Sequence, residues 1–152
     1  MSTHGGASKR TAAEIESAGP VDAVLGDDGT TIETLRQQVT RLATRGGFAD
    51  RADDLALALV EVLANALEHG EPPVRVRAWL DGRLVIEVAD QGSGFDLAIV
   101  PDSPPTHHGH RGRGLWIVRQ LVDVMKVRHA TSGPSKGSTV RIELSPEPHI
   151  GA

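Results

Sequence analysis

Apolar and polar residues alternate along several short segments of the chain, which is the pattern of a β-strand with one buried face. Five such segments predict strands, at about residues 21–25, 74–80, 84–90, 126–131 and 140–144. Asp81-Gly82 separates the second segment from the third, and this dipeptide favours a hairpin with a two-residue turn. The two strands on either side of it are therefore expected to pair in antiparallel fashion.

Other segments carry apolar residues at the spacing of one helix face. They predict helices at about residues 31–45, 52–69 and 113–125. Residues 30–33 have capping-box spacing, so we expect the first helix to begin at Thr31, and Gly46-Gly47 to end it. Asp50 can cap the start of the second helix, and Gly70 can serve as its C-cap.

The order of these elements indicates the fold class. It reads strand, helix, helix, strand, strand, loop, helix, strand, strand. Strands linked by hairpins favour a mixed, mostly antiparallel sheet, and helices on one of its faces would make a two-layer α+β sandwich. We expect residues 1–19 to form a disordered arm, residues 20–145 to form one folded domain, and residues 146–152 to form a tail.

Composition narrows the classes of function. The chain has 152 residues and no cysteine, which excludes disulfides, cysteine-ligated metals and a thiol nucleophile. Its net charge is −4 and aromatic residues make up only 3%, so we expect no direct contact with nucleic acid. The first residues lack the apolar core of a signal peptide, and no apolar run approaches the roughly 18 residues of a membrane span. We therefore expect a cytoplasmic protein that does not enter a membrane.

The predicted helix at 52–69 carries a polar stripe formed by Asp54, Glu61, Asn65, Glu68 and His69. A solvated stripe is the ordinary interpretation of such a pattern. However, solvated stripes usually contain Lys and Arg as well, and this one contains neither. A carboxylate and an amide one helical turn apart suit a hard cation such as Mg²⁺, which prefers oxygen ligands.

Three glycine-containing segments offer further candidate chemistry. Residues 90–95 (Asp-Gln-Gly-Ser-Gly-Phe) directly follow a strand, so the aspartate could accept a hydrogen bond from a ligand amine. Residues 112–115 (Gly-Arg-Gly-Leu) open a helix, whose free amides could bind phosphate. Residues 137–139 (Gly-Ser-Thr) enter the last strand and could place a hydroxyl beside a ligand. Each segment taken alone could equally be an ordinary turn.

Together these segments resemble the conserved boxes of the GHKL ATPase superfamily, whose members share the Bergerat nucleotide-binding fold. The N box resembles residues 61–69, the G1 box 90–95, the G2 box 112–115 and the last box 137–139. The resemblance covers about residues 21–145. Within the superfamily the chain looks most like bacterial anti-sigma-factor serine/threonine kinases, because it has one catalytic-type domain, a short stretch between the G1 and G2 boxes, and Gly-Arg-Gly-Leu-Trp-Ile-Val at 112–118.

The resemblance implies a role for each matching residue. Glu61 would be the catalytic carboxylate that orients or deprotonates the attacking hydroxyl, and Asn65, one turn away, would coordinate Mg²⁺ on the ATP phosphates. Asp90 would accept a hydrogen bond from the adenine amino group, with help from Thr139. The remaining nucleotide-binding residues that it implies are Gly92, Gly94, Phe95, Gly112, Arg113, Gly114 and Leu115, of which Gly112 and Gly114 would articulate the ATP lid.

The activity implied by the resemblance is that of an ATP- and Mg²⁺-dependent kinase. Such a kinase would phosphorylate an antagonist (anti-anti-sigma) protein and regulate a sigma factor by partner switching, and it could be a homodimer. Two other hypotheses stay open. The chain could be a nucleotide-gated protein-binding module without significant transfer, or the detached catalytic domain of a histidine kinase.

Overall fold

The structure is a computed structural model, and it describes residues 18–92, 113–130, 132–133 and 136–146. The strands are β1 (Val21–Val24), β2 (Arg75–Leu80), β3 (Leu84–Asp90), β4 (Val124–Ala130) and β5 (Gly137–Leu144). The helices are α2 (Ile32–Arg45), α3 (Ala52–His69) and α4 (Arg113–Leu121), and short 3-10 turns occupy Asp27–Gly29 and Ala49–Arg51. The arm expected at residues 1–19 lies outside the described residues as far as residue 17.

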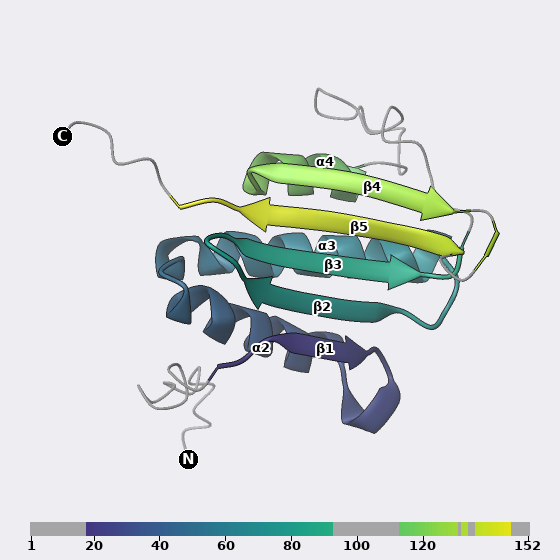
Figure 1. Ribbon diagram of the computed structural model, residues 1–152, viewed down its shortest axis with the longest axis horizontal. Coiled ribbons are helices and arrows are strands. Elements are labelled where there is room, and N and C mark those ends of the chain that lie inside the picture. The colour runs from purple at the N-terminus through teal and green to yellow at the C-terminus, as the bar shows by residue number, and fades with distance from the viewer. Residues whose placement is uncertain (1–17, 93–112, 131, 134–135, 147–152) are drawn as a thin grey trace, which may run out of the picture.

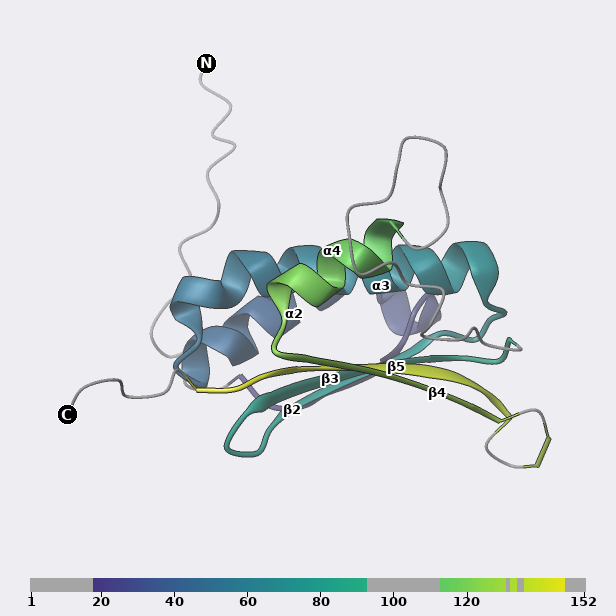
Figure 2. The ribbon, with the colours of Figure 1, turned by 90° about the horizontal axis from the view of Figure 1, so that it is seen from above.

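The strands form one sheet in the order β1-β2-β3-β5-β4, and each neighbouring pair is antiparallel. Figure 1 shows this sheet in front of the helices. Figure 2 shows α2, α3 and α4 on one face of the sheet, with the other face left open. The α+β fold class, with its antiparallel sheet and its helices on one side, is thus confirmed.

The core lies between the helices and the inner face of the sheet, and α3 runs through its middle. The side chains of Leu55, Leu59 and Leu63, one turn apart along α3, are almost completely buried. They pack against inward-facing strand residues such as Ile86 and Ile142. Such a continuous apolar stripe is what a helix needs when it is covered on several sides. Because α3 also carries Glu61 and Asn65, the core that holds this helix in place positions both side chains.

The ends of α2 and α3 differ slightly from the sequence prediction. The N-cap of α2 is Thr31, whose side chain accepts a hydrogen bond from the backbone N–H of Thr34. The helix therefore begins at Ile32, one residue later than predicted, and Thr34 closes the capping box. The expected cap at Asp50 is wrong, because Ala49–Arg51 form a 3-10 turn that leads directly into α3. Gly70 is confirmed as the C-cap of α3.

Two other boundaries also differ. The β2–β3 hairpin has three connecting residues rather than two, and the N–H of Asp81 donates to the carbonyl of Arg83. The helix predicted at 113–125 ends at Leu121, and β4 begins at Val124. Val124 and Met125, the residues whose assignment changes, are half-buried in the strand. The strand also gains pairing with β5, which decides the outcome.

The open face of the sheet carries charged side chains and one buried acid. Glu143 on β5 is only 2% exposed and accepts hydrogen bonds from Arg83 (2.6 Å) and Arg141 (2.9 Å). These two guanidinium groups, Arg141 first, hold the pKa of Glu143 below its ordinary value, against the opposing effect of burial. Among the described helices, none combines the length and the apolar character that a bilayer span requires.

We predict that Glu143→Gln lowers the free energy of unfolding at neutral pH by about 1–3 kcal/mol, because charge-assisted hydrogen bonds to a buried group are lost. Since the pKa of Glu143 is lower in the folded state, its stabilising contribution is present above the ordinary glutamate pKa of about 4.5 and is lost as the pH falls through the folded-state pKa. Urea denaturation of the wild-type protein and the variant at neutral pH and at about pH 3 measures both effects.

The matched control is Glu33→Gln, which removes an exposed acid paired with Arg36. Its effect should stay within about 0.5–1 kcal/mol. An equal loss in the two variants, or a difference between Glu143→Gln and wild type that does not shrink in acid, would contradict the role given to Glu143.

Candidate functional site

The polar stripe predicted on α3 divides into two groups in the structure. Asp54, Glu68 and His69 are exposed, as an ordinary solvated face would be. Glu61 and Asn65 are only half-exposed and follow one another by one helical turn, so their side chains lie on the same face. Neither side chain has a hydrogen bond or ion-pair partner within the part of the chain that is described. A carboxylate and an amide are therefore held on one face of α3, and no described residue occupies their polar atoms.

The first turn of α4 lies directly against Glu61. A Cβ atom added to Gly114 would be 2.6 Å from Oε2 of Glu61, which is closer than real Cβ contacts allow. Leu115, the next residue, is 3% exposed and belongs to the core, so it fixes α4 in this position. The absence of a side chain at Gly114 therefore leaves the space that the Glu61 carboxylate occupies.

Asp90 ends β3 and has a buried side chain, 9% exposed. Its Oδ1 accepts hydrogen bonds from the backbone N–H of Gly92 (2.6 Å) and, at a longer distance, from that of Glu71 (3.4 Å). The N–H of Gln91 donates to the carbonyl of Glu71 and ties the two segments together. Oδ2 has no partner among the described residues. One oxygen thus anchors the carboxylate, and the other is available as an acceptor.

Glycines surround Asp90 on three sides. A Cβ atom would lie 2.4 Å from Asp90 Cγ if added to Gly70, and 2.8 Å from Asp90 Oδ1 if added to Gly92. At Gly137, which has a φ of 130°, it would lie 2.2 Å from the carbonyl oxygen of Asp90. The end of α3 and the loop after β3 can approach the carboxylate, and the start of β5 can approach the backbone of Asp90, only because these positions lack side chains. Gly70 was predicted as a helix cap, and its contact with Asp90 was not foreseen.

The pairing of β3 with β5 determines which hydroxyl shares a face with Asp90. Asp90 lies opposite Ser138, and Ala89 lies opposite Thr139. Directly opposed residues point to the same face of a sheet, and successive residues alternate between faces. Ser138, 3% exposed, is therefore on the helix side with Asp90. Thr139, to which the sequence assigned this position, faces the open side of the sheet and lines a hollow there.

The structure describes only some of the other residues expected in the site. Gly94, Phe95 and Gly112 lie outside the described residues, and Arg113 is the first residue of α4. Gly92 and Gly114 make the contacts described above. Among the described residues, no three His, Cys, Asp or Glu side chains gather as a metal centre would require.

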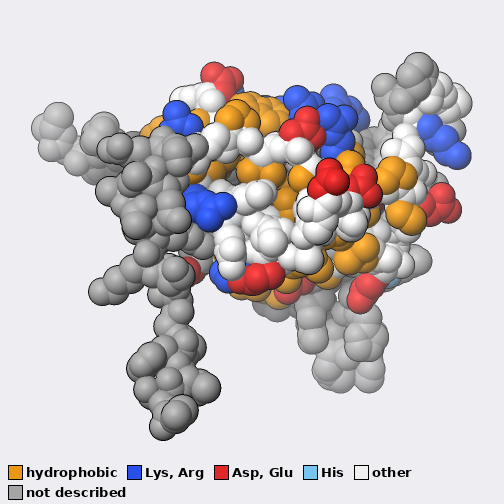
Figure 3. Space-filling view, turned by 90° about the horizontal axis from the view of Figure 1, so that it is seen from below, with side chains coloured by type: hydrophobic (Ala, Val, Ile, Leu, Met, Phe, Trp, Pro, Cys, Tyr) orange, Lys and Arg blue, Asp and Glu red, His pale blue; other side chains and the backbone are white. Residues whose placement is uncertain are grey.

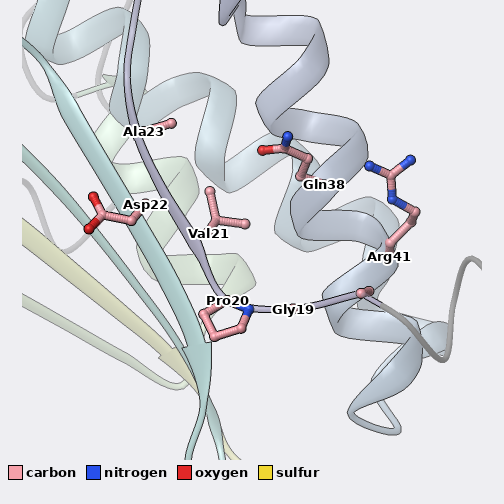
Figure 4. Close-up of a pocket in the computed structure, with 8 residues that line it drawn as sticks. Gly19, Pro20, Val21, Asp22, Ala23, Gln38 and Arg41 are labelled. Atoms are coloured by element: carbon pink, nitrogen blue, oxygen red, sulfur yellow. The ribbon is translucent and has the colours of Figure 1, made fainter.

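Two hollows lie on other parts of the described surface, and one of them reaches the edge of this site. Figure 4 shows one between β1 and α2, with a volume of about 370 Å³ and Gln38 and Arg41 of α2 at its wall. β2 separates it from β3, and it opens beside the beginning of β1. The second, of about 730 Å³, lies over the open face of the sheet and touches Asp90 and Ser138 only where the strands end. The candidate site is instead the set of residues on the helix side, carried by α3, the first turn of α4 and the ends of β3 and β5.

Comparison with known proteins gives consistent results. The family model described as histidine kinase-like ATPase domain matches residues 27–144. The serine-protein kinase RsbW of Bacillus licheniformis is 32% identical over 110 residues, which cover 62% of this chain and 68% of that protein. The sensor histidine kinase component HK1 of Mycobacterium tuberculosis is 34% identical over 109 residues, 63% of this chain and 64% of that protein.

A solved structure, the mycobacterial sensor histidine kinase MprB, shares the fold. It superposes with a TM-score of 0.51 and 21% sequence identity, and the match covers 84% of this chain and 98% of that one. The superposition supports the layer arrangement described above. At this identity it supports the fold alone.

We predict that Gly70→Ala lowers the free energy of unfolding by about 1–3 kcal/mol, because the new methyl group must displace the Asp90 carboxylate. The backbone at Gly70 (φ −95°) accepts alanine, so the effect reports the collision alone. Gly19→Ala is the control, since a Cβ there meets nothing within 4 Å. Chemical denaturation measures both variants, and equal stability of the two would show that the approach of α3 to Asp90 is not close.

Proposed function

Because this chain belongs to the histidine kinase-like ATPase domain family, we propose that it binds MgATP and transfers the γ-phosphoryl group to a serine or threonine of another protein. The proposal rests on one observation: the helix side of the sheet carries two separate groups of polar side chains. At the ends of β3 and β5 lies a carboxylate with one oxygen that has no partner among the described residues. On α3 lies a carboxylate–amide couple that no described residue pairs with. The first group suits a base and the second suits a metal-bound phosphate chain.

At the base end, Asp90 and Ser138 would recognise adenine. The Oδ2 oxygen of Asp90 would accept a hydrogen bond from the adenine amino group, while the Gly92 and Glu71 amides keep the carboxylate in place. Ser138, opposite Asp90 on the same face, would supply the hydroxyl that the resemblance assigned to Thr139. The buried carboxylate of Asp90 would discriminate against bases that lack the amino group, because its Oδ2 oxygen would then be left without a hydrogen-bond donor.

At the phosphate end, Asn65 would hold the metal through its amide oxygen. Mg²⁺ is commonly held by few protein ligands together with substrate phosphates and water, which agrees with the single side chain available here. MgATP, when bound, supplies the electrophilic γ-phosphoryl group. Glu61 would orient the acceptor hydroxyl and take up its proton, since positioning and charge stabilisation dominate phosphoryl transfer.

The remaining glycines would have two roles, as the resemblance implies. Gly112 and Gly114 would articulate the ATP lid, and Gly92 and Gly94 would let the backbone pass beside the nucleotide, with Phe95 and Arg113 as further nucleotide-binding residues. Leu115 would act indirectly, because its side chain is buried in the core and holds α4 in place. Gly114 would be a hinge of the lid, and it lies where a side chain would collide with the carboxylate of Glu61.

The relatives named as serine-protein kinases support serine as the acceptor. On the resemblance described above, the acceptor would belong to an antagonist (anti-anti-sigma) protein, and the kinase would also bind a sigma factor in the cytoplasm. A second candidate is the catalytic domain of a histidine kinase, which the 34% identity to a sensor histidine kinase component favours. Acid-stable phosphate on the labelled acceptor would identify a serine or threonine kinase, and acid-labile phosphate a histidine kinase.

We predict that Ser138→Ala weakens ATP binding by about tenfold and that Asp90→Asn weakens it by more, because each removes a polar partner of the base. Thr139→Val is the matched control on the neighbouring position, and it should leave the affinity unchanged because Thr139 faces the other side of the sheet. Calorimetric titration of each folded variant with MgATP measures these affinities. A larger loss in Thr139→Val than in Ser138→Ala would contradict this assignment.

We predict that Glu61→Gln retains ATP binding but slows phosphoryl transfer by about 10²–10⁴-fold, because the amide cannot accept the proton of the acceptor hydroxyl. Glu68→Gln, on the exposed side of the same helix, should transfer at the wild-type rate. Labelling of the acceptor protein with radioactive ATP measures the rate. If wild type and Glu61→Gln bind ATP equally and neither transfers phosphate, the chain is a nucleotide-gated binding module.

A further inference from the structure

The open face of the sheet carries a cluster of arginines, here defined as Arg77 on β2, Arg128 on β4 and Arg141 on β5. All three surround the carboxylate of Glu87 on β3, at 4.0, 3.8 and 3.8 Å respectively. Side-chain alternation places these residues on the face that the helices do not cover. Figure 3, which views the molecule from its β1 side, shows Lys and Arg side chains gathered along the upper rim, where the sheet lies.

The charges in this cluster do not balance. One carboxylate faces three guanidinium groups, and Glu87 itself is only 14% exposed. Each distance exceeds that of a hydrogen bond, so Glu87 attracts the guanidinium groups without occupying their donors. Arg141 donates through Nε to Glu143, whereas Arg77 and Arg128 donate to no acceptor among the described residues. Several N–H donors of Arg77 and Arg128 are therefore directed to solvent, in a region of positive potential.

This imbalance contrasts with the chain as a whole, whose net charge is −4. Some other arginines on the described surface have close acidic partners, such as Arg75 with Asp22 at 2.7 Å and Arg51 with Asp123 at 2.8 Å. Exposed arginines that outnumber the neighbouring acids repel one another and contribute little to the stability of the fold. A guanidinium group is well suited to a carboxylate, which it can bind through two parallel hydrogen bonds.

Trp79 adds an apolar surface to the cluster. The guanidinium groups of Arg77 and Arg141 lie over its ring, 5.4 and 5.5 Å from the centroid. These contacts hold the two arginines in place and reduce the conformational entropy that a ligand would otherwise have to remove. The surface is also hollowed, by a cavity of about 730 Å³ that Arg77, Glu87 and Arg128 line and another of about 400 Å³ beside Arg141.

We propose that the arginine cluster on the open face of the sheet binds a carboxylate-rich segment of a partner protein. The carboxylates of this segment would pair with Arg77, Arg128 and Arg141, and its apolar side chains would lie on Trp79. The three arginines lie on the open face of the sheet, whereas the proposed nucleotide site lies on the helix side, and the 730 Å³ hollow meets that site only at Asp90 and Ser138, where the strands end. The proposal therefore does not depend on ATP binding or on transfer of phosphate.

The acidic residues of the same face favour a protein segment over a nucleic acid. Asp22, Glu87 and Glu143 are interspersed among the arginines, and they would repel a continuous phosphate backbone passing over them. The negative net charge of the chain would add to this repulsion. A peptide can instead place its carboxylates only where the guanidinium groups lie.

The test uses the full chain labelled with ¹⁵N and short poly-L-glutamate as the probe. The chain has two tryptophans, so two indole N–H signals are expected, and Trp116→Phe assigns them. Poly-L-glutamate should shift the Trp79 signal and leave that of Trp116 unchanged. The double variant Arg77→Ala/Arg128→Ala should weaken binding by at least about tenfold, and added salt should weaken wild-type binding.

Two further variants make the test specific. Arg36→Ala/Arg45→Ala removes the same charge from α2, on the other side of the sheet, and should bind as wild type does. Glu87→Gln removes the acid that competes for the guanidinium groups and should strengthen binding by at least about threefold. Weaker binding by Glu87→Gln, equal losses in the two double variants, or tighter binding of a DNA duplex than of poly-L-glutamate at this face would overturn the proposal.

Discussion

The close approach of α3, β3 and β5 around the carboxylate of Asp90 is the constraint on which the proposed site depends. A buried carboxylate needs hydrogen bonds, and here the backbone amides of Gly92 and Glu71 provide them. Those amides reach the carboxylate only because Gly70 and Gly92 present no side chain to it, and Gly137 likewise lets β5 lie against the backbone of Asp90. The C-terminal end of α3 is therefore fixed relative to the ends of β3 and β5. Glu61 and Asn65, farther back along the same rigid helix, are placed by the same contact.

The central helix serves the core and the site with different residues. Leucines at one-turn intervals bury against the sheet, and this burial fixes the rotation of α3 about its own axis. That rotation brings Glu61 and Asn65 toward α4 and leaves Asp54, Glu68 and His69 in solvent. Gly114 then allows the first turn of α4 to lie against Glu61. The geometry of the carboxylate–amide couple is thus set by hydrophobic packing that does not itself touch a ligand.

The two faces of the sheet have different tasks. The inner face is apolar until Asp90 and Ser138, where the strands end beside the helices. The open face carries alternating charges, and its arginines exceed its acids around Glu87. Because residues alternate strictly along a strand, the same five strands can support a nucleotide site on one side and a surface for a protein partner on the other.

The sequence by itself determined the elements, their order and the family, because periodic apolar residues and the four motif segments are local features. It also identified Glu61 and Asn65 as a pair, since the helical repeat places them one turn apart. Only the tertiary structure decided that Ser138, and not Thr139, lies beside Asp90, because this depends on the register between two strands. In the same way, residues 124–125 joined a strand because pairing with β5 outweighed helical periodicity. Asp50 does not cap α3, because it lies within a 3-10 turn that leads into the helix. Local patterns record what one segment prefers, whereas register and close approach depend on segments far apart in the chain.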